Sequence, residues 1–231
     1  NAKFVAYPTN VCEVVGLINL SKELGEKFKV VGNASNILFP DGGFDGIIIS
    51  LKKFCMIERL GEETYLLASG TSLSSVLNET SKAGLSGLEF LVGVPALVGG
   101  AVVMNAGACG KSFADVLESV TFYDGNTIVT KPIKDLEFAY RKSCFTENKE
   151  LVVLFAKVKL KKEKIENINR NINNFLSKRL SSQPKGKSAG CVFKNTSEFS
   201  AGAIIDLLGL KGFRVGGAVV SSKHANFIIN D

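Results

Sequence analysis

The 231-residue sequence predicts an α+β fold rather than a doubly wound parallel sheet. Short apolar runs rich in β-branched residues recur along the chain, and several longer segments have helical spacing or helix-capping signals. The two kinds of segment alternate without the regular rhythm of βαβ units, which favours α+β. With 45% hydrophobic and 22% charged residues, the composition excludes a disordered or fibrous chain.

The first predicted elements are a helix and two short buried strands. Asn10 and Glu13 have the spacing of a capping box, which predicts a helix over residues 10–26. The apolar residues of its first turns lie on one face: Val11, Val14, Val15 and Ile18. Residues 29–31 and 47–49 are β-branched runs next to turn-forming residues, and both are predicted as strands.

The middle of the chain is predicted to form a helix and several antiparallel strands. A strand pair is expected at residues 54–59 and 64–68, and a helix over 72–83 ends at Gly84, a good left-handed stop. Asp124-Gly125 is a hairpin signal. The remaining predictions are strands at 118–123, 126–131, 151–160, 214–220 and 225–229, and helices at 163–179 and 201–208.

Residues 90–110 carry no charge and are long enough, at 21 residues, to suggest a membrane span. Five glycines, Pro95 and Asn105 argue against one, because the lipid interior does not satisfy the backbone groups that a broken helix leaves free. We expect instead a buried, glycine-rich loop that lies against a ligand, since glycine lets the main chain approach where a Cβ would clash.

Charge is divided unevenly along the chain, although the formal net charge is only +6. Residues 1–130 carry 9 Lys and Arg against 13 Asp and Glu, whereas residues 131–231 carry 19 against 9. The basic half favours an anionic small molecule first and a solvated surface second. Nucleic acid ranks third, because the lysines of residues 157–162 are not interleaved with stacking aromatic residues.

The cysteines and the single histidine limit the available chemistry. One His excludes multi-histidine zinc sites, and no two of the five Cys form a CxxC motif, so we predict no metal site. An odd number of widely spaced cysteines indicates reduced thiols and therefore a cytoplasmic protein.

Nucleotide-binding motifs are weak when each is considered alone. No two glycines stand in a G-x-G relation, so the Rossmann fingerprint is absent. Residues 105–112 end like a Walker loop, but Asn105 replaces the first glycine and no helical pattern follows, so a P-loop NTPase is the weakest hypothesis. The loop GNASN at 32–36 follows a strand and offers successive backbone N–H groups for an anion nest.

Four segments of the chain resemble the UDP-N-acetylenolpyruvoylglucosamine reductase family, the flavoenzymes of peptidoglycan synthesis. They occur in the same order as in the family and at nearly the same spacing. They are VVGNASNILFPDGGFDGIII (30–49), GLEFLVGVPALVGGAVVMNAGACG (87–110), LEFAYRKSCF (136–145) and residues 183–230, which begin QPKGKSAGCVFKN. The similarity covers nearly the whole chain. The short distance between the third and fourth segments resembles the branch of the family that lacks an extra substrate-covering loop.

The resemblance implies a two-part FAD-binding module of the vanillyl-alcohol-oxidase type and an α+β substrate domain. We place the two FAD-binding subdomains at residues 1–51 and 52–162, and the substrate-binding domain at 163–231. This domain is expected to continue beyond Asp231, where the catalytic glutamate of the family would lie.

The resemblance also implies a role for individual residues. The FAD pyrophosphate would be cradled by Gly32, Asn33, Ala34, Ser35 and Asn36. The flavin would be lined by Val94, Pro95, Gly99, Gly100, Asn105, Ala106 and Gly107. The catalytic residues would be Arg141, beside the enolpyruvyl carboxylate, and Cys191, at a proton-donor position more often occupied by Ser. Substrate-binding groups are expected at Tyr140, Arg179 and Asn195.

Two positions depart from the family pattern. The family usually has Gly where this chain has Ala34, and a Gly-Ser or Gly-Thr pair where it has Ala96-Leu97. The first change constrains the backbone near phosphate, and the second removes a hydroxyl donor. Both put flavin affinity in question.

The chemistry implied by the resemblance suits the two proposed catalytic residues. Reduction of an enol ether adds a hydride to one carbon and a proton to the other, and negative charge develops beside the carboxylate. A guanidinium such as that of Arg141 stabilises this charge. A thiol, with a pKa of about 8.5, is a stronger acid than a serine hydroxyl, so Cys191 can supply the proton while it stays protonated. Taken alone, a cysteine is more often a small buried residue and an arginine a surface ion pair.

Two hypotheses from different classes follow. The first is reduction of UDP-N-acetylglucosamine enolpyruvate to UDP-N-acetylmuramate, with FAD and NADPH, by a cytoplasmic monomer with no nucleic-acid or membrane partner. The alternative is a non-catalytic UDP-sugar or nucleotide-binding protein on the same fold, and the departures at Ala34 and Ala96-Leu97 motivate it.

Overall fold

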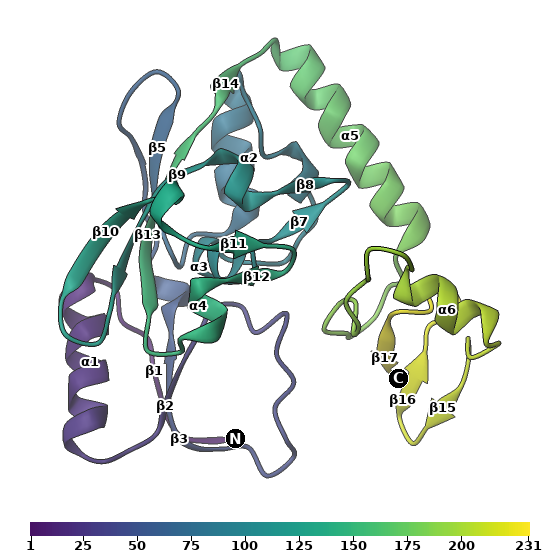
Figure 1. Ribbon diagram of the computed structural model, residues 1–231, viewed down its shortest axis with the longest axis horizontal. Coiled ribbons are helices and arrows are strands. Elements are labelled where there is room, and N and C mark those ends of the chain that lie inside the picture. Colours follow the sequence, from purple (N-terminus) through teal and green to yellow (C-terminus); the bar gives the residue numbers. More distant parts are fainter. The chain divides into compact units, whose positions relative to one another are not determined.

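A computed structural model describes residues 1–231, which divide into two compact units. Unit 1 consists of Asn1–Asn33 and Phe39–Asn173, and unit 2 of Ala34–Leu38 and Asn174–Asp231. Helices and strands are mixed in both (Figure 1), which confirms the predicted α+β class. The helices are α1 (Val11–Glu23), α2 (Leu73–Lys82), α3 (Val98–Val103), α4 (Cys144–Glu147), α5 (Ile165–Ser182) and α6 (Ala201–Leu207).

Unit 1 begins with a small parallel sheet. Its strands are β1 (Ala2–Ala6), β2 (Phe28–Val31) and β3 (Phe44–Ser50), in the order β1-β3-β2. Helix α1 connects β1 to β2, and the predicted capping box forms at its start: the Glu13 N–H donates to Asn10 Oδ1 at 2.9 Å, and Asn10 Nδ2 donates to Glu13 Oε1 at 2.8 Å.

A larger antiparallel sheet follows in unit 1. Its strands are β4 (Ile57–Arg59), β5 (Thr64–Ala68), β9 (Leu117–Tyr123), β10 (Ile128–Pro132) and β13 (Val152–Lys159). Their order is β10-β9-β13-β5-β4, so the predicted hairpin at Asp124-Gly125 joins β9 to β10 and the long strand β13 lies at the centre.

One hydrophobic cluster spans both sheets. Its buried members are Val14, Ile18, Ile47, Ile49, Leu51, Phe54, Ala68, Tyr123, Val152 and Leu154. The rings of Phe54 and Phe155 add an edge-on contact, with centroids 5.2 Å apart. The predicted subdomain boundary between residues 51 and 52 thus falls within a shared core, and the division remains a prediction.

Residues 90–110 contain regular structure where the sequence predicted a loop. Helix α3 occupies the middle of the segment, and β7 (Gly107–Ala108) pairs with β8 (Lys111–Ser112) in a hairpin. The helix forms because Val98, Ala101 and Val102 are fully buried, and such packing outweighs the low helix propensity of glycine. None of the helices is both long enough and apolar enough to cross a bilayer.

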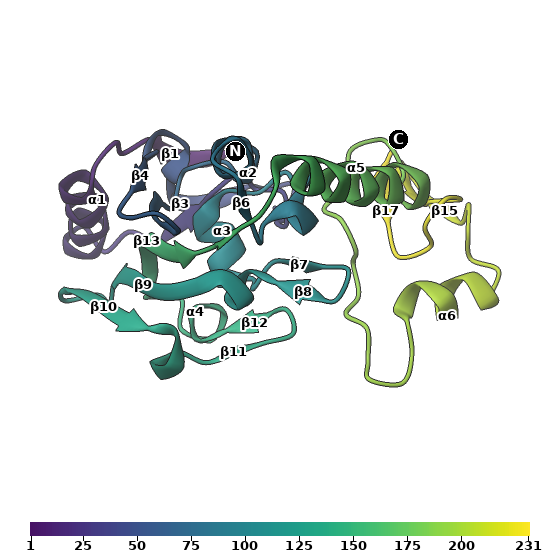
Figure 2. The same cartoon turned by 90° about the horizontal axis from the view of Figure 1, so that it is seen from above.

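Two further short pairings complete unit 1. Strand β6 (Leu85–Ser86) pairs with β14 (Lys161–Lys162), and β11 (Phe138–Ala139) pairs with β12 (Lys142–Ser143). Both views of the ribbon place the β7–β8 and β11–β12 hairpins near α3 (Figures 1 and 2). This arrangement gathers most of the predicted site residues of unit 1.

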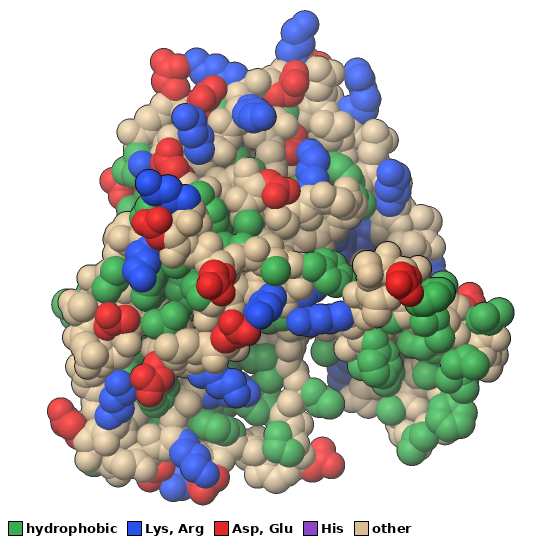
Figure 3. All heavy atoms as spheres, in the orientation of Figure 1, with side chains coloured by type: hydrophobic (Ala, Val, Ile, Leu, Met, Phe, Trp, Pro, Cys, Tyr) green, Lys and Arg blue, Asp and Glu red, His purple; other side chains and the backbone are tan.

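Unit 2 contains α6 and a three-stranded antiparallel sheet, β15 (Arg214–Val215), β16 (Ala218–Val220) and β17 (Ile228–Asn230). The strand predicted over 214–220 is interrupted by a turn at Gly216, whose φ is 56°. The buried hydrophobic residues of this unit are Ala225 and Phe227. Its other large apolar side chains are mostly exposed (Figure 3), so turns and hydrogen bonds contribute much of its order.

Candidate functional site

The loop 32–36 leaves a run of backbone donors free of protein acceptors. It follows β2, and the N–H groups of Asn33, Ala34, Ser35 and Asn36 donate to no acceptor of the chain. The Asn33 Nδ2 donates to the carbonyl of Pro95 at 2.9 Å. The structure therefore brings together two parts of the predicted cofactor site that lie about sixty residues apart in sequence.

Both departures from the family pattern have visible structural consequences. Ala34 has a φ of 54°, in the left-handed region where glycine is favoured and other L-residues are strained by about 1–2 kcal/mol. Leu97 is buried, and its side chain lies 3.5 Å from the position that a Cβ on Gly32 would occupy. An apolar side chain thus fills space beside the start of the loop.

The two adjacent glycines of α3 have different surroundings. A Cβ on Gly99 would lie 2.8 Å from Ser69 Cβ and 3.2 Å from Ser69 O, and the Gly99 N–H already donates to that carbonyl at 2.8 Å. A Cβ on Gly100 would meet no atom within 4 Å. Gly99 therefore serves the packing of α3, whereas Gly100 presents bare main chain to open space, as a ligand surface requires.

Asn105 is held by the protein itself. It is 6% exposed and has a φ of 41°; its Nδ2 donates to the carbonyl of Ala139 at 3.0 Å, and its Oδ1 accepts from the N–H of Ala114 at 3.1 Å. Both ends of the amide are thus used by backbone groups. Similarly, a Cβ on Gly107 would lie 2.6 Å from the carbonyl of Lys111, so the β7–β8 hairpin itself requires glycine there.

Arg141 lies in the turn between β11 and β12, next to Tyr140, with a φ of 55°. Its guanidinium donates to the carbonyl of Gly107 at 2.5 Å and lies over the Tyr140 ring at 5.7 Å from the centroid. The Ser143 hydroxyl donates to the carbonyl of Val103 at 2.6 Å. Together with the bond from Asn105, three hydrogen bonds fasten the arginine-bearing hairpin to the end of the glycine-rich segment.

Sequence reasoning missed Ser143, because no local pattern relates it to Val103 forty residues earlier. It ranked a Walker-like loop at 105–112 as the weakest hypothesis, and the structure agrees with that ranking. Those residues form the β7–β8 hairpin, with positive φ at Cys109 and Gly110, and a 3-10 turn at 113–116 follows instead of the helix that a P-loop needs.

The other predicted site residues belong to unit 2. Cys191 is exposed and forms an isolated backbone bridge with Phe227. Asn195 Oδ1 accepts from the N–H of Ala201, the first residue of α6, at 3.0 Å. Arg179, near the end of α5, donates to Oε1 of Gln183, the residue after the helix, at 2.9 Å. Arg141 and Cys191 thus belong to different units.

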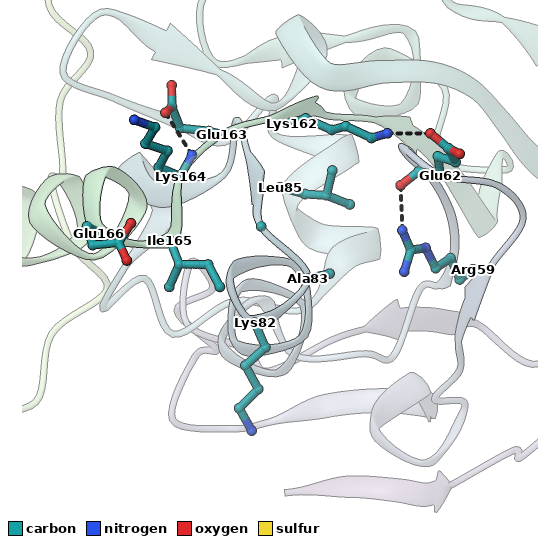
Figure 4. Close-up of a pocket in the computed structure, with 11 residues that line it drawn as sticks. Arg59, Glu62, Lys82, Ala83, Leu85, Lys162, Glu163, Lys164, Ile165 and Glu166 are labelled. Carbon is teal, nitrogen blue, oxygen red and sulfur yellow. Dashed lines mark hydrogen bonds and ion pairs between the residues drawn. The ribbon is translucent and has the colours of Figure 1, made fainter.

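Two open surface pockets of unit 1 are lined by other residues. One, of about 430 Å³, is lined by Arg59, Glu62, Lys82, Ala83, Gly84, Leu85 and residues 162–166 (Figure 4). Its cations are partly matched: Lys162 forms an ion pair with Glu62, and Arg59 donates to the Glu62 carbonyl. The other, of about 400 Å³, lies along Tyr7, Pro8 and α1. Neither contains a predicted site residue.

Comparisons with known proteins agree with this geometry. Residues 2–131 match the FAD-binding domain family, and residues 183–231 match the C-terminal domain of UDP-N-acetylenolpyruvoylglucosamine reductase. The chain is 44% identical over 206 residues to the reductase of that name from Pseudothermotoga lettingae, covering 87% of this chain and 71% of that protein. It is 40% identical over 234 residues to the one from Caldicellulosiruptor saccharolyticus, covering 99% and 74%.

A solved structure extends the similarity to three dimensions. The crystal structure of UDP-N-acetylenolpyruvylglucosamine reductase from Thermus caldophilus superposes with a TM-score of 0.83 at 38% identity, covering 99% of this chain and 80% of that one. The chain is therefore an FAD-dependent oxidoreductase of the UDP-N-acetylenolpyruvoylglucosamine reductase family.

Proposed function

We propose that this protein reduces UDP-N-acetylglucosamine enolpyruvate to UDP-N-acetylmuramate, with NADPH as the electron donor, in the synthesis of cell-wall precursors. The observation that carries the proposal is the fastening of the Arg141 hairpin to the glycine-rich segment of the FAD-binding domain. It sets a cation suited to a carboxylate beside main chain suited to a flat cofactor.

The loop 32–36 and the glycine-rich segment 90–110 fit FAD. The unpaired N–H groups of residues 33–36 suit a pyrophosphate, and the bare main chain at Gly100 suits the approach of a ring. Val94, Pro95 and Ala106 would contribute the rest of the lining. When bound and reduced by NADPH, FAD supplies the hydride that the enol ether accepts.

In this proposal Arg141 binds the carboxylate of the enolpyruvyl group. One of its five N–H donors is used by the Gly107 carbonyl, which fixes the plane of the guanidinium. The donors that point elsewhere can form a bidentate pair with the carboxylate and stabilise the negative charge that develops there during reduction. Tyr140, Arg179 and Asn195 are proposed to contact the rest of the substrate.

Cys191 is proposed to protonate the second alkene carbon. The S–H bond breaks as the new C–H bond forms, which leaves a thiolate that recovers its proton from solvent. The net change is the two-electron reduction of the enol ether by NADPH, with one proton taken up. General-acid catalysis of this kind contributes about 10²- to 10⁴-fold to the rate.

The test follows flavin colour in the intact gene product. Without substrate, NADPH should bleach the oxidised flavin, and the enolpyruvyl UDP-sugar should restore it. Cys191→Ala should leave the rate of flavin bleaching by NADPH within about twofold of the unsubstituted rate. It should slow flavin reoxidation by the substrate by at least about 10²-fold. Cys191→Ser, which installs the residue more common in the family, should recover part of the loss. Cys109→Ala is the matched control, since Cys109 lies at the tip of the β7–β8 hairpin.

A second candidate is a non-catalytic binder of a UDP-sugar or nucleotide on the same fold, favoured by the strained Ala34 at the pyrophosphate loop. It predicts a colourless protein that FAD cannot reconstitute but that still binds UDP-sugar in a calorimetric titration. A yellow protein that turns over NADPH only with the enolpyruvyl substrate excludes it. We also propose that the protein is cytoplasmic and acts as a monomer. Light scattering on the purified protein tests its oligomeric state.

A further inference from the structure

In unit 2, a buried asparagine holds the segment that carries Cys191. Asn226 is 3% exposed and lies one residue before Phe227, the backbone-bridge partner of Cys191. Its backbone carbonyl accepts from the N–H of Val192 at 2.9 Å. The segment 191–193 therefore runs alongside 226–227 although no regular strand is formed there.

The Asn226 side chain extends this pairing by one residue. Its Oδ1 accepts from the N–H of Phe193 at 2.9 Å, and its Nδ2 donates to the carbonyl of Phe193 at 2.8 Å. One amide thus satisfies both backbone groups of Phe193, as a neighbouring strand would. Among side chains of this length only asparagine offers a donor and an acceptor in that arrangement.

Asn226 is itself fixed by the turn before it. Ser221 Oγ accepts from the N–H of Lys223 at 3.1 Å and of His224 at 3.3 Å. His224 Nδ1 accepts from the N–H of Asn226 at 3.3 Å, and the His224 ring packs edge-on against Phe227 with centroids 4.9 Å apart. His224 thus has a structural role in this turn.

This hydrogen-bonded turn matters because unit 2 has little apolar core to hold Cys191. Val192 and Phe193, the two residues that follow it, are 48% and 58% exposed, so packing does not fix them. The hydrogen bonds of Asn226 to Val192 and Phe193 hold these two residues instead. Asn226 is buried, and both ends of its side-chain amide are hydrogen-bonded to Phe193. Asn226 can therefore affect the substrate only through the position of the segment 191–193.

We propose that Asn226 is a positioning residue for Cys191, which it fixes through Val192 and Phe193 for proton delivery. This inference rests on the proposed function. A displacement of about 1 Å at a reacting group can reduce the rate by about 10²-fold. Loss of the hydrogen bonds that join Asn226 to Val192 and Phe193, which we call the clamp, should therefore slow the step that depends on the thiol and leave other steps unchanged.

The test uses Asn226→Asp, which keeps the size and the acceptor oxygen but removes the Nδ2 donor, and Asn226→Ala, which removes both. Asn230→Asp is the matched control in the same unit, because Asn230 takes part in pairing through its backbone. Exchange of the β16 and β17 amides checks that each variant stays folded. Exchange of the Val192 and Phe193 amides, together with the rate of Cys191 alkylation by iodoacetamide, reports the clamp directly.

In Asn226→Ala, which removes the acceptor of the Phe193 N–H, we expect exchange at Phe193 to accelerate, and in both Asn226 variants we expect alkylation of Cys191 to accelerate. Reoxidation of the flavin by substrate should slow by about tenfold or more, while bleaching by NADPH stays within about twofold of the unsubstituted enzyme. In a Cys191→Ala background, Asn226→Asp should slow reoxidation no further. Normal reoxidation in a variant whose Phe193 amide has lost protection, or a full additional loss in the double variant, would overturn the inference. An unsubstituted enzyme without reductase activity would instead refute the proposed function, and the exchange data would still decide whether the clamp exists.

Discussion

A methyl group added at each of the two adjacent glycines of α3 separates fold from ligand surface. At Gly99 the new carbon would lie 2.8 Å from Ser69 Cβ and 3.2 Å from the Ser69 carbonyl, and neither atom belongs to a flexible side-chain end. At Gly100 it would meet nothing within 4 Å. Gly99→Ala therefore tests packing, and Gly100→Ala tests whether the open face of α3 carries the cofactor.

The expected magnitudes follow from these surroundings. Alanine is favoured over glycine in a helix by about 1 kcal/mol. At Gly100 nothing opposes this gain, so the flavin-free protein should become more stable by up to about 1 kcal/mol. At Gly99, overpacking costs about 1–3 kcal/mol, so the net change should be a loss of up to about 2 kcal/mol. If the flavin lies against Gly100, the methyl group should weaken FAD binding by at least about tenfold, or 1.4 kcal/mol.

Two measurements on each variant separate the effects. Urea unfolding of flavin-free protein, followed by circular dichroism, gives the order of stability, and titration with FAD, followed by flavin fluorescence, gives the affinity. Gly61→Ala is the control, since a Cβ there also meets nothing within 4 Å and the residue lies in the turn between β4 and β5. A Gly99→Ala protein more stable than Gly100→Ala would refute the packing argument. Unchanged FAD affinity in Gly100→Ala would show that the ring lies elsewhere.

The remaining predictions concern the loop 32–36 and the thiols of Cys55 and Cys144. Ala34→Gly should relieve a left-handed strain of about 1–2 kcal/mol, partly offset by the greater freedom of glycine in the unfolded chain, and should tighten FAD binding in the same fluorescence titration. Burial raises the pKa of the Cys55 and Cys144 thiols, so less of each is thiolate at any given pH. Cys144, which is half-buried, and Cys55, whose thiol donates to the carbonyls of Lys52 and Gly70, should both be alkylated more slowly than Cys109 across a pH series read by mass spectrometry. Equal rates would contradict this reasoning.

Elements whose signals are local could be predicted from the sequence. The start of α1 depends on Asn10 and Glu13, which bond each other across one turn. The β9–β10 hairpin depends on Asp124, whose Oδ1 accepts from the N–H of Asn126 at 2.9 Å and of Thr127 at 2.8 Å. Those same two bonds lower the pKa of the Asp124 carboxyl, the Thr127 bond contributing most. In such cases the residues that determine the structure are sequence neighbours.

Elements that depend on distant partners could not be predicted. Helix α3 was expected as a loop because its glycines are poor helix formers, yet Gly99 fits only because Ser69, thirty residues earlier, lies against it. The assignment of Asn105 to the flavin lining stays a prediction, but the sequence did not show that its amide joins Ala139 to Ala114. No pattern within the segment 90–110 reports either contact. The clamp at Asn226 could not be predicted for the same reason, since Asn226 and its partner Phe193 are thirty-three residues apart.

A sequence motif assigns a residue to a site but does not show which atoms that residue contacts. Of the predicted flavin-lining residues, Gly99 and Gly107 avoid clashes with the protein's own main chain, and Asn105 bonds that main chain. Gly100 and the N–H groups of residues 33–36, by contrast, are not used by the protein and are open to a ligand. The contacting surface is thus smaller than the matching segment, and the rest of the segment sets its shape. A substitution at Gly99 or Asn105 that abolishes activity would therefore report on the framework, whereas only one that spares stability and weakens FAD binding locates the ring.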